Sequence, residues 1–256
     1  MPLVETDAIV LHAFDYSETS RILRLATRDA GVQSVLARGA RRSKSKVGTA
    51  VDLFAQGAAE LHLREGRELQ TLSRFDVTRA RPALGDDLGR FTGASVVAEI
   101  MLRFAAADEA HPELFDTLAA ALDRIAIAAP ERAAEPSLAS AWQLLAELGF
   151  APQLAACASC GNALADAEHT IIHSALGGAL CAACVSKHPG GRRLPRAELA
   201  RLARWVSGER DGGGAIAAPE VRAHQRLLRE FLEYHLSDSR PLRAFAAWET
   251  GHWDAA

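Results

Sequence analysis

Four cysteines are the residues of this chain whose type and spacing point most directly to chemistry. Cys157 and Cys160 are separated by two residues, as are Cys181 and Cys184, and twenty residues lie between the two pairs. A spacing of two residues lets both thiolates of a pair reach one ion from a tight turn, and two such turns complete a tetrahedral site. The pattern therefore predicts one Zn²⁺ held by four thiolates, in a zinc module over residues 154–188.

Two other interpretations of the cysteines are disulfide bonds and a redox C-x-x-C motif. Disulfides are rare in a reducing cytosol, and redox motifs rarely occur as two spaced pairs. A catalytic zinc is not expected, because four thiolates leave no coordination position for water. His111-Pro112-Glu113 matches part of a deaminase signature, but that signature requires a proline directly before the C-x-x-C, where Ala156 and Leu180 stand here. We expect His111 to begin a helix instead.

A second candidate site is a basic stretch over residues 38–46, which holds five Lys or Arg in nine residues together with glycine and serine. Such a strip suits phosphate groups, and the small residues let backbone N–H groups approach them. The alternative is a solvated charged loop, which most charge runs are. The predicted nucleic-acid contacts are Arg38, Arg41, Arg42, Lys44 and Lys46, with Arg21 and Arg24 on a neighbouring predicted strand.

A smaller basic cluster, Arg192, Arg193 and Arg196, follows the cysteines. It could bind phosphate or an acidic partner, or it could simply be solvated. Arg226 and Arg229 lie on the polar side of a predicted helix further on. The chain shows no Walker motif, no Ser/His/Asp arrangement and no carboxylates clustered with histidine, so we predict a binding protein rather than an enzyme.

Composition and charge limit the class of protein. The chain has 256 residues, is 49% hydrophobic and 24% charged, and has a net charge of −3, which is ordinary for a globular protein. Residues 1–81 carry 13 Lys and Arg against 10 Asp and Glu, whereas residues 82–150 carry 4 against 11, so a basic part precedes an acidic one. No apolar run approaches the ~18 residues of a membrane span. The first residues have no basic segment typical of a secretory signal, so a cytoplasmic location is expected.

The basic stretch falls among five predicted strands. Residues 59–64 alternate apolar and polar side chains, and a turn at Gly66 precedes a return strand. Five short strands with tight turns in about 75 residues are typical of a small closed barrel such as the OB-fold. An open sheet covered by helices is the alternative. The predicted strands are Ala8–Ala13, Ile22–Thr27, Val32–Ala37, residues 59–64 and Leu69–Phe75.

From Pro82 onward the apolar residues recur at helical spacing. Pro130 and Pro136 are predicted to bracket a linker, and residues 171–180 a short hairpin that carries the second cysteine pair. The fold class is therefore predicted as α+β and multidomain: an OB-fold barrel over 1–80, then a helical domain over 81–256 with the zinc module embedded. The predicted helices run from Leu84 to Phe104, from Pro112 to Ile125, from Trp142 to Leu148, from Pro195 to Val206, and on from Pro219.

Several of these segments together resemble the bacterial DNA repair protein RecO family. They are residues 8–20, Gly31 with the strand that runs into residues 38–42, Leu53-Phe54, the hairpin over 60–75, the helical middle and the two cysteine pairs. Each motif is short, but their order matches over nearly the whole chain. The resemblance implies an N-terminal OB-fold, a helical C-terminal domain and a zinc module that some relatives have lost.

The resemblance also implies a function. A member of this family would be a recombination mediator that binds single- and double-stranded DNA, anneals complementary strands and assists RecA loading, with RecR as a partner. Such a protein would be cytoplasmic and nucleoid-associated, with no membrane partner. The family's basic barrel loop corresponds to residues 38–46. A grip on the acidic C-terminal tail of single-strand-binding protein would fall on the C-terminal domain, where the candidates are Arg192, Arg193, Arg226 and Arg229.

Two other classes of function remain as alternatives. One is a zinc-ribbon adaptor that binds proteins and does not touch nucleic acid, and the other is a nuclease, which no carboxylate cluster supports. Few aromatic residues lie on the predicted strands, so we expect base stacking to contribute less than phosphate neutralisation.

Overall fold

The computed structural model describes residues 3–40, 52–107, 109–209, 216–236 and 240–251. The chain forms two compact units, Met1–Ala133 and Ala134–Ala256, and each is described separately. In the described ranges no helix is both long and apolar enough to cross a membrane.

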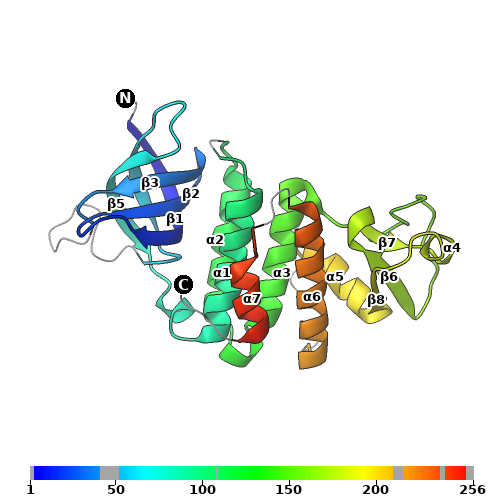
Figure 1. Cartoon of the computed structure of the whole chain (residues 1–256). Helices are drawn as coiled ribbons and strands as arrows, with labels where there is room; N and C mark the ends of the chain where they lie inside the picture. Colours follow the sequence, from blue (N-terminus) through cyan, green and yellow to red (C-terminus); the bar gives the residue numbers. More distant parts are fainter. Residues whose placement is uncertain (1–2, 41–51, 108, 210–215, 237–239, 252–256) are drawn as a thin grey trace. The chain divides into compact units, whose positions relative to one another are not determined.

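The first unit begins with five strands that close into a barrel in the order β1-β2-β3-β5-β4 (Figure 1). Neighbouring strands are antiparallel except β3 and β5, which pair in parallel through Val35–Ala37 and Gln70–Leu72. All five predicted strands are present, and closure of the barrel removes the open edges that five short strands would otherwise expose. The strands are β1 (Leu3–Asp15), β2 (Arg21–Thr27), β3 (Gly31–Ala37), β4 (Gln56–His62) and β5 (Gln70–Arg79).

The barrel interior is filled by small and aliphatic side chains, with one aromatic ring, Phe75, among them. In β1 the alternation changes phase at a bulge. Ala8 and Val10 face the interior before the bulge, whereas Ala13 packs against it afterwards, because the register with β2 shifts between Val10 and His12. The extra residue in a bulge moves the side chains that follow to the opposite face of the strand. His12 and Phe14 are therefore placed on the outer surface.

Two helices complete the first unit, α1 (Leu88–Phe104) and α2 (Pro112–Ile127), which pack against each other. Asp87 begins α1 by accepting a hydrogen bond from the N–H of Arg90 at 2.9 Å. His111 begins α2: its Nδ1 accepts the N–H of Leu114 and Pro112 takes the first helical position. The prediction that His111 starts a helix is confirmed. Short 3-10 turns, η1 (Pro82–Leu84) and η2 (Pro130–Arg132), precede α1 and follow α2.

Arg81, just beyond β5, makes an extensive set of polar contacts. Its side chain is only 2% exposed. Its Nε donates to Asp123 of α2 at 2.7 Å, and Nη1 donates to the carbonyl oxygen of Phe54 at 2.8 Å. Nη2 donates to Gln56 of β4 and to the carbonyl of Ala119. One buried guanidinium thus joins the barrel wall, the segment before β4 and α2.

The second unit contains a helical core and a small sheet. Its helices are α3 (Ala134–Leu145), extended by a π turn η3 (Ala146–Phe150), α5 (Arg196–Ser207), α6 (Ala218–His235) and α7 (Arg243–Thr250). Trp142 of α3 is fully buried and meets Phe231 of α6 edge-on, with ring centroids 5.2 Å apart. The predicted linker ending at Pro136 is wrong, because Pro136 lies in the first turn of α3, where proline is tolerated. Helix α7 was not predicted.

A buried, hydrogen-bonded pair of side chains lies between α5 and α6. His224 is fully buried, and its Nε2 lies 2.9 Å from the Glu198 carboxylate. Arg201 donates to Glu198 at 3.1 Å and to Glu135 of α3 at 3.1 Å, so the pair connects three helices. Burial lowers the pKa of His224, although Glu198 acts in the opposite direction.

We expect the stability of the second unit to fall as the pH drops from about 7 to about 5. His224 binds a proton more weakly when folded than when unfolded, where its pKa is near 6.5. The unfolded state therefore takes up more protons below that pH, and the free energy of unfolding decreases. His224→Gln should flatten this dependence, although not abolish it, because burial also lowers the pKa of His235. Urea unfolding followed by tryptophan fluorescence tests this, since all four tryptophans lie in residues 142–253; an identical pH profile in the variant would contradict it.

Candidate metal centre and nucleic-acid interface

The four cysteines come together at one place in the second unit. Their sulfur atoms all lie within 4.8 Å of one another, and none of the four forms a disulfide. Cys157 and Cys160 lie in a tight turn in which the N–H of Gly161 donates to the carbonyl of Cys157. Cys181 stands at the start of the short helix α4 (Ala182–Val185), and Cys184 lies within it. The predicted set of four ligands is thus assembled from two separate turns.

A three-stranded sheet supports the cysteine cluster, in the order β7-β6-β8 (Figure 1). The predicted hairpin is present as β6 (His169–His173) and β7 (Gly178–Leu180), and β8 (Arg192–Pro195) adds a strand that was not predicted. Gly178 is required where it lies, because a Cβ there would overlap the carbonyl oxygen of Gln153, which accepts the N–H of Ala179. The N–H of Ala158 donates to the carbonyl of Ala179, which ties the first cysteine turn to β7.

The donor set fits a metal ion of the zinc type. Backbone N–H groups, that of Cys181 first, lower the pKa of Cys157 to about 6. The backbone N–H of Asn162 lowers the pKa of Cys160, but the neighbouring thiols of Cys157 and Cys184 outweigh it and raise that pKa to about 11. A dication bound between the four sulfur atoms would offset two of the four negative charges that four thiolates carry, and so favour their ionised form. Four thiolate ligands are typical of a closed structural zinc site.

Of the cations predicted to contact nucleic acid, three lie in the described part of the barrel. Arg38 directly follows β3 and is exposed. Arg21 begins β2 and donates to Asp15 at 3.1 Å, so part of its charge is offset. Arg24 pairs with His12 across β1 and β2, on the outer face. Arg41, Arg42, Lys44 and Lys46 lie outside the described residues, so their role stays a prediction.

The four arginines predicted to bind a partner are placed differently. Arg192 forms a bidentate ion pair with Glu230, and Arg229 lies 3.1 Å from Glu249. Arg193 donates to Nδ1 of His169. Arg226 is exposed on α6. Their role in binding a partner stays a prediction. To bind an acidic partner, Arg192 and Arg229 would first have to break their ion pairs with Glu230 and Glu249.

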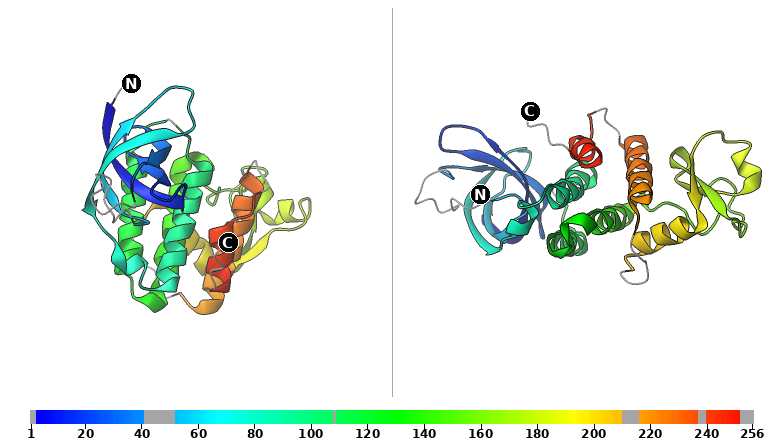
Figure 2. Two further views of the ribbon diagram at one scale, coloured as in Figure 1. Left: turned by 60° about the vertical axis from the view of Figure 1, so that its left-hand side comes forward. Right: turned by 90° about the horizontal axis from the view of Figure 1, so that it is seen from below.

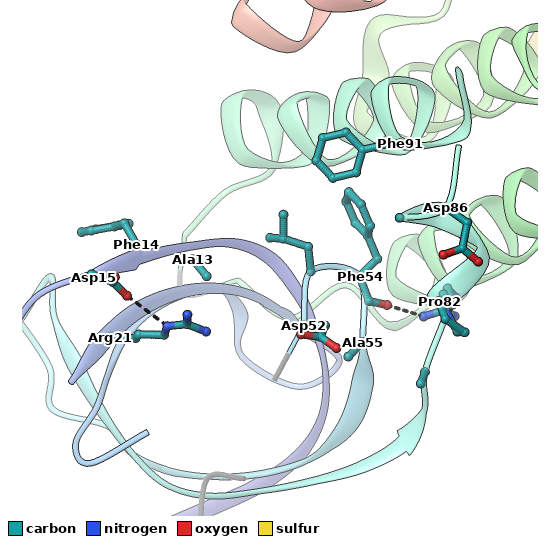
Figure 3. A pocket seen from close by; sticks show the side chains of 14 residues that line it. Ala13, Phe14, Asp15, Arg21, Asp52, Phe54, Ala55, Pro82, Asp86 and Phe91 are labelled. Carbon is teal, nitrogen blue, oxygen red and sulfur yellow. Dashed lines mark hydrogen bonds and ion pairs between the residues drawn. The ribbon is translucent and has the colours of Figure 1, made fainter. Parts of the chain in front are cut away.

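A pocket of about 750 Å³ opens beside the barrel in the first unit (Figure 3). Phe54 and Phe91 meet near its centre with ring centroids 6.0 Å apart, and Phe54 takes a left-handed backbone φ of 66°. Asp15, Asp52 and Asp86 also line the pocket. The three carboxylates outnumber the two guanidinium groups of Arg21 and Arg81, so this pocket is unsuited to phosphate. No sequence pattern indicated the pocket.

Exposed aromatic rings on β1 are a feature that sequence reasoning missed. Phe14 is 45% exposed, and Tyr16, just beyond the strand, is 61% exposed. The spacing of His12, Phe14 and Tyr16 by two residues was visible in the sequence. The face on which they lie was not, because it depends on the bulge at Leu11.

The fold and the site define a class of protein: a closed β-barrel followed by helices, with a four-cysteine module suited to a structural metal. Two family models match the chain, "Recombination protein O N terminal" over residues 1–81 and "Recombination protein O C terminal" over residues 85–244. The chain belongs to the recombination protein O (RecO) family.

Curated relatives match at nearly full length. The DNA repair protein RecO of Anaeromyxobacter sp. (strain K) is 35% identical over 253 residues, which cover 96% of each chain. The protein of the same name from Nocardioides sp. is 30% identical and covers 95% of this chain and 98% of its own. That of Symbiobacterium thermophilum is 31% identical over 82% of each chain.

Proposed function

We propose that this protein is a DNA repair and recombination mediator. It binds single- and double-stranded DNA, anneals complementary strands and assists RecA loading together with RecR, without a catalytic centre of its own. The observation that carries the proposal is membership of the RecO family through both of its family models. Curated relatives that match nearly end to end are named DNA repair proteins, which supports it.

The barrel is the DNA-binding part in this proposal. Its five strands, with β1 paired to both β2 and β4 and β3 parallel to β5, agree with an OB-fold. Arg38 and the basic residues 41–46 that follow it supply positive charge for phosphates. Neutralised phosphates on two strands repel each other less, so complementary bases can meet, and this gives annealing a physical cause. Binding to DNA would also make the protein cytoplasmic and nucleoid-associated.

The second unit provides the scaffold and a partner surface. Cys157, Cys160, Cys181 and Cys184 would hold one Zn²⁺, whose contribution is to stabilise the fold. The acidic C-terminal tail of single-strand-binding protein, or RecR, would bind near Arg192, Arg193, Arg226 and Arg229. Arg226 is exposed on α6.

Strand annealing at low salt tests the proposal and the role of the basic loop. We expect the protein to accelerate annealing of complementary oligonucleotides and to lose DNA affinity steeply as salt rises. Replacing Arg41, Arg42 and Lys44 together with alanine should reduce the slope of log K against log salt by about 2, at about 0.7 per lost phosphate contact on single strands. Fluorescence anisotropy over a salt titration measures the slope.

Arg132→Ala, which removes an exposed cation from η2, is the matched control and should leave the slope unchanged. An unchanged slope in the triple variant would exclude the loop as the phosphate track. Absence of any DNA binding at low salt would refute the proposal and leave the zinc-ribbon adaptor of protein partners as the better interpretation.

A further inference from the structure

The barrel exposes two large aromatic side chains, two residues apart in the sequence, at one end of β1. Phe14 is 45% exposed and Tyr16 is 61% exposed, while the side chains that fill the barrel interior are buried. Exposed aromatic rings that lie next to one another commonly mark a binding surface, because a ring left in water forgoes the free energy of burial.

The fold holds these rings outward. After the bulge at Leu11, Ala13 packs against the interior, so Phe14 lies on the outer face. The Phe14 ring contacts His12, with ring centroids 5.7 Å apart. Tyr16 begins the turn to β2, and its N–H donates to the carbonyl of Ser20 at 3.0 Å. Both rings are therefore carried on backbone that is fixed by hydrogen bonds.

A hollow of about 540 Å³ lies beside Tyr16. Its other lining residues are Thr19 and Ser20 of the same turn, and Leu36, Arg38 and Gly39 at the end of β3. The hollow thus combines an aromatic ring, two hydroxyl groups and the guanidinium of Arg38, and its described lining includes no carboxylate. The nearby carboxylate of Asp15 is paired with Arg21 at 3.1 Å. A ring for a base next to a cation for a phosphate is the chemistry of a nucleotide site.

We propose that Phe14 and Tyr16 form a stacking platform for bases of single-stranded DNA, with Arg38 binding the adjoining phosphate across the hollow. This inference rests on the proposed function and adds to it a means of telling single strands from duplex. Tyr16 follows the last residue of β1, and two residues of extended backbone span about 6.6 Å, roughly twice the 3.4 Å rise per nucleotide in a duplex. Bases that occupy both rings must therefore be unstacked from each other, which a single strand permits and a duplex resists. Base stacking then contributes more than the aromatic content of the sequence led us to expect.

The experiment compares three DNA ligands of equal length: a poly-thymidine strand, the same strand with abasic sites in place of the bases, and a duplex. The full chain and its Phe14→Ala and Tyr16→Ala variants are titrated by fluorescence anisotropy. Each alanine variant should bind the poly-thymidine strand at least about fivefold more weakly. The slope of log K against log salt should stay that of the wild type, because the lost contact carries no charge. Affinity for the abasic strand and for the duplex should be the same in wild type and variants.

Two further variants of Tyr16 distinguish the effect of the aromatic ring from that of side-chain volume, and a variant of Tyr234 tests whether the position of the ring matters. Tyr16→Phe keeps a ring and should bind as the wild type does, whereas Tyr16→Leu keeps apolar volume without a ring and should bind as Tyr16→Ala does. Tyr234→Ala removes the other tyrosine of the chain, which is 57% exposed on α6, and should have no effect. Circular dichroism verifies that each variant is folded.

The platform is refuted if the wild type binds poly-thymidine and both alanine variants bind it equally well, or if the variants lose affinity for duplex and abasic strand to the same extent. Either result leaves the proposed function standing, because DNA binding itself is intact. If the wild-type chain binds none of the three ligands at low salt, the proposed function fails, and the platform fails with it.

Discussion

Cys160→Ser is expected to release the metal and to unfold the region around the cysteines. Serine is a poor zinc ligand, so three thiolates would remain where the four sulfur atoms now lie within 4.8 Å of one another. Binding of structural zinc contributes on the order of 10 kcal/mol to the folding of such modules. The hydrophobic cluster at the cysteines is small, since it consists of Cys157, Leu180 and Cys184 with a few partly buried neighbours. The sheet β7-β6-β8 should therefore lose its structure together with the ion.

Metal analysis of the purified variant and hydrogen exchange measure the two parts of this expectation. We expect about one equivalent of zinc in the wild type and none in Cys160→Ser, with fast exchange over residues 154–195 and unchanged protection in the barrel strands. Ser159→Ala is the matched control: its hydroxyl lies 3.0 Å from Nε2 of His188 and is no part of the sulfur cluster. It should keep the metal. One equivalent of zinc still bound to Cys160→Ser would refute a site of four thiolates.

Arg81→Ala is expected to lower the free energy of unfolding of the first unit by about 2–4 kcal/mol, because buried acceptors left without their donor cost about 1–3 kcal/mol each. The side chain is 2% exposed. Its loss would leave the Asp123 carboxylate and the carbonyl oxygens of Phe54 and Ala119 without this donor. Arg81→Lys should restore little of the loss, because an ammonium cannot reproduce the planar set of donors.

Arg79→Ala offers a matched control, because Arg79 pairs with the same carboxylate of Asp123 while its own side chain is 58% exposed. An exposed ion pair contributes at most about 1 kcal/mol, so this variant should be nearly as stable as the wild type. Chemical unfolding monitored by far-ultraviolet circular dichroism, with tryptophan fluorescence as the separate signal of the second unit, distinguishes the two variants. Equal, small effects of both would show that the buried contacts of Arg81 contribute little to stability.

Local patterns were enough to predict most elements of the barrel and the helices. Alternation over residues 59–64 indicated a strand, and β4 covers Gln56–His62. Pro112 after His111 indicated a helix start, and α2 begins there. Where the prediction failed, the local signal was ambiguous. Proline is common both in linkers and in the first turn of a helix, so Pro136 by itself did not distinguish the two. Helix α7 has only eight residues, Arg243–Thr250, too few for a clear period.

The same distinction applies to the candidate sites: some of their properties follow from local spacing, and others do not. Clustering of the four cysteines was predictable because the spacing within each pair confines its two sulfur atoms to one turn, whatever the rest of the chain does. Which individual arginines form ion pairs within the protein was not predictable. Arg192 and Glu230 are 38 residues apart in the chain, and nothing in the surroundings of either residue indicates that they form an ion pair.

By itself, the sequence determined the set of four cysteines suited to a metal ion, the order of most strands and helices, and the family to which the chain belongs. These properties depend on residue type and on spacing within a few positions. The tertiary structure alone decided which side chains are buried or exposed: Arg81 became a buried connection, and Phe14 an exposed ring. The physical reason is that burial depends on contacts between segments distant in sequence. A one-residue bulge at Leu11, set by pairing with β2, is enough to move an aromatic ring from the barrel interior to its outer surface.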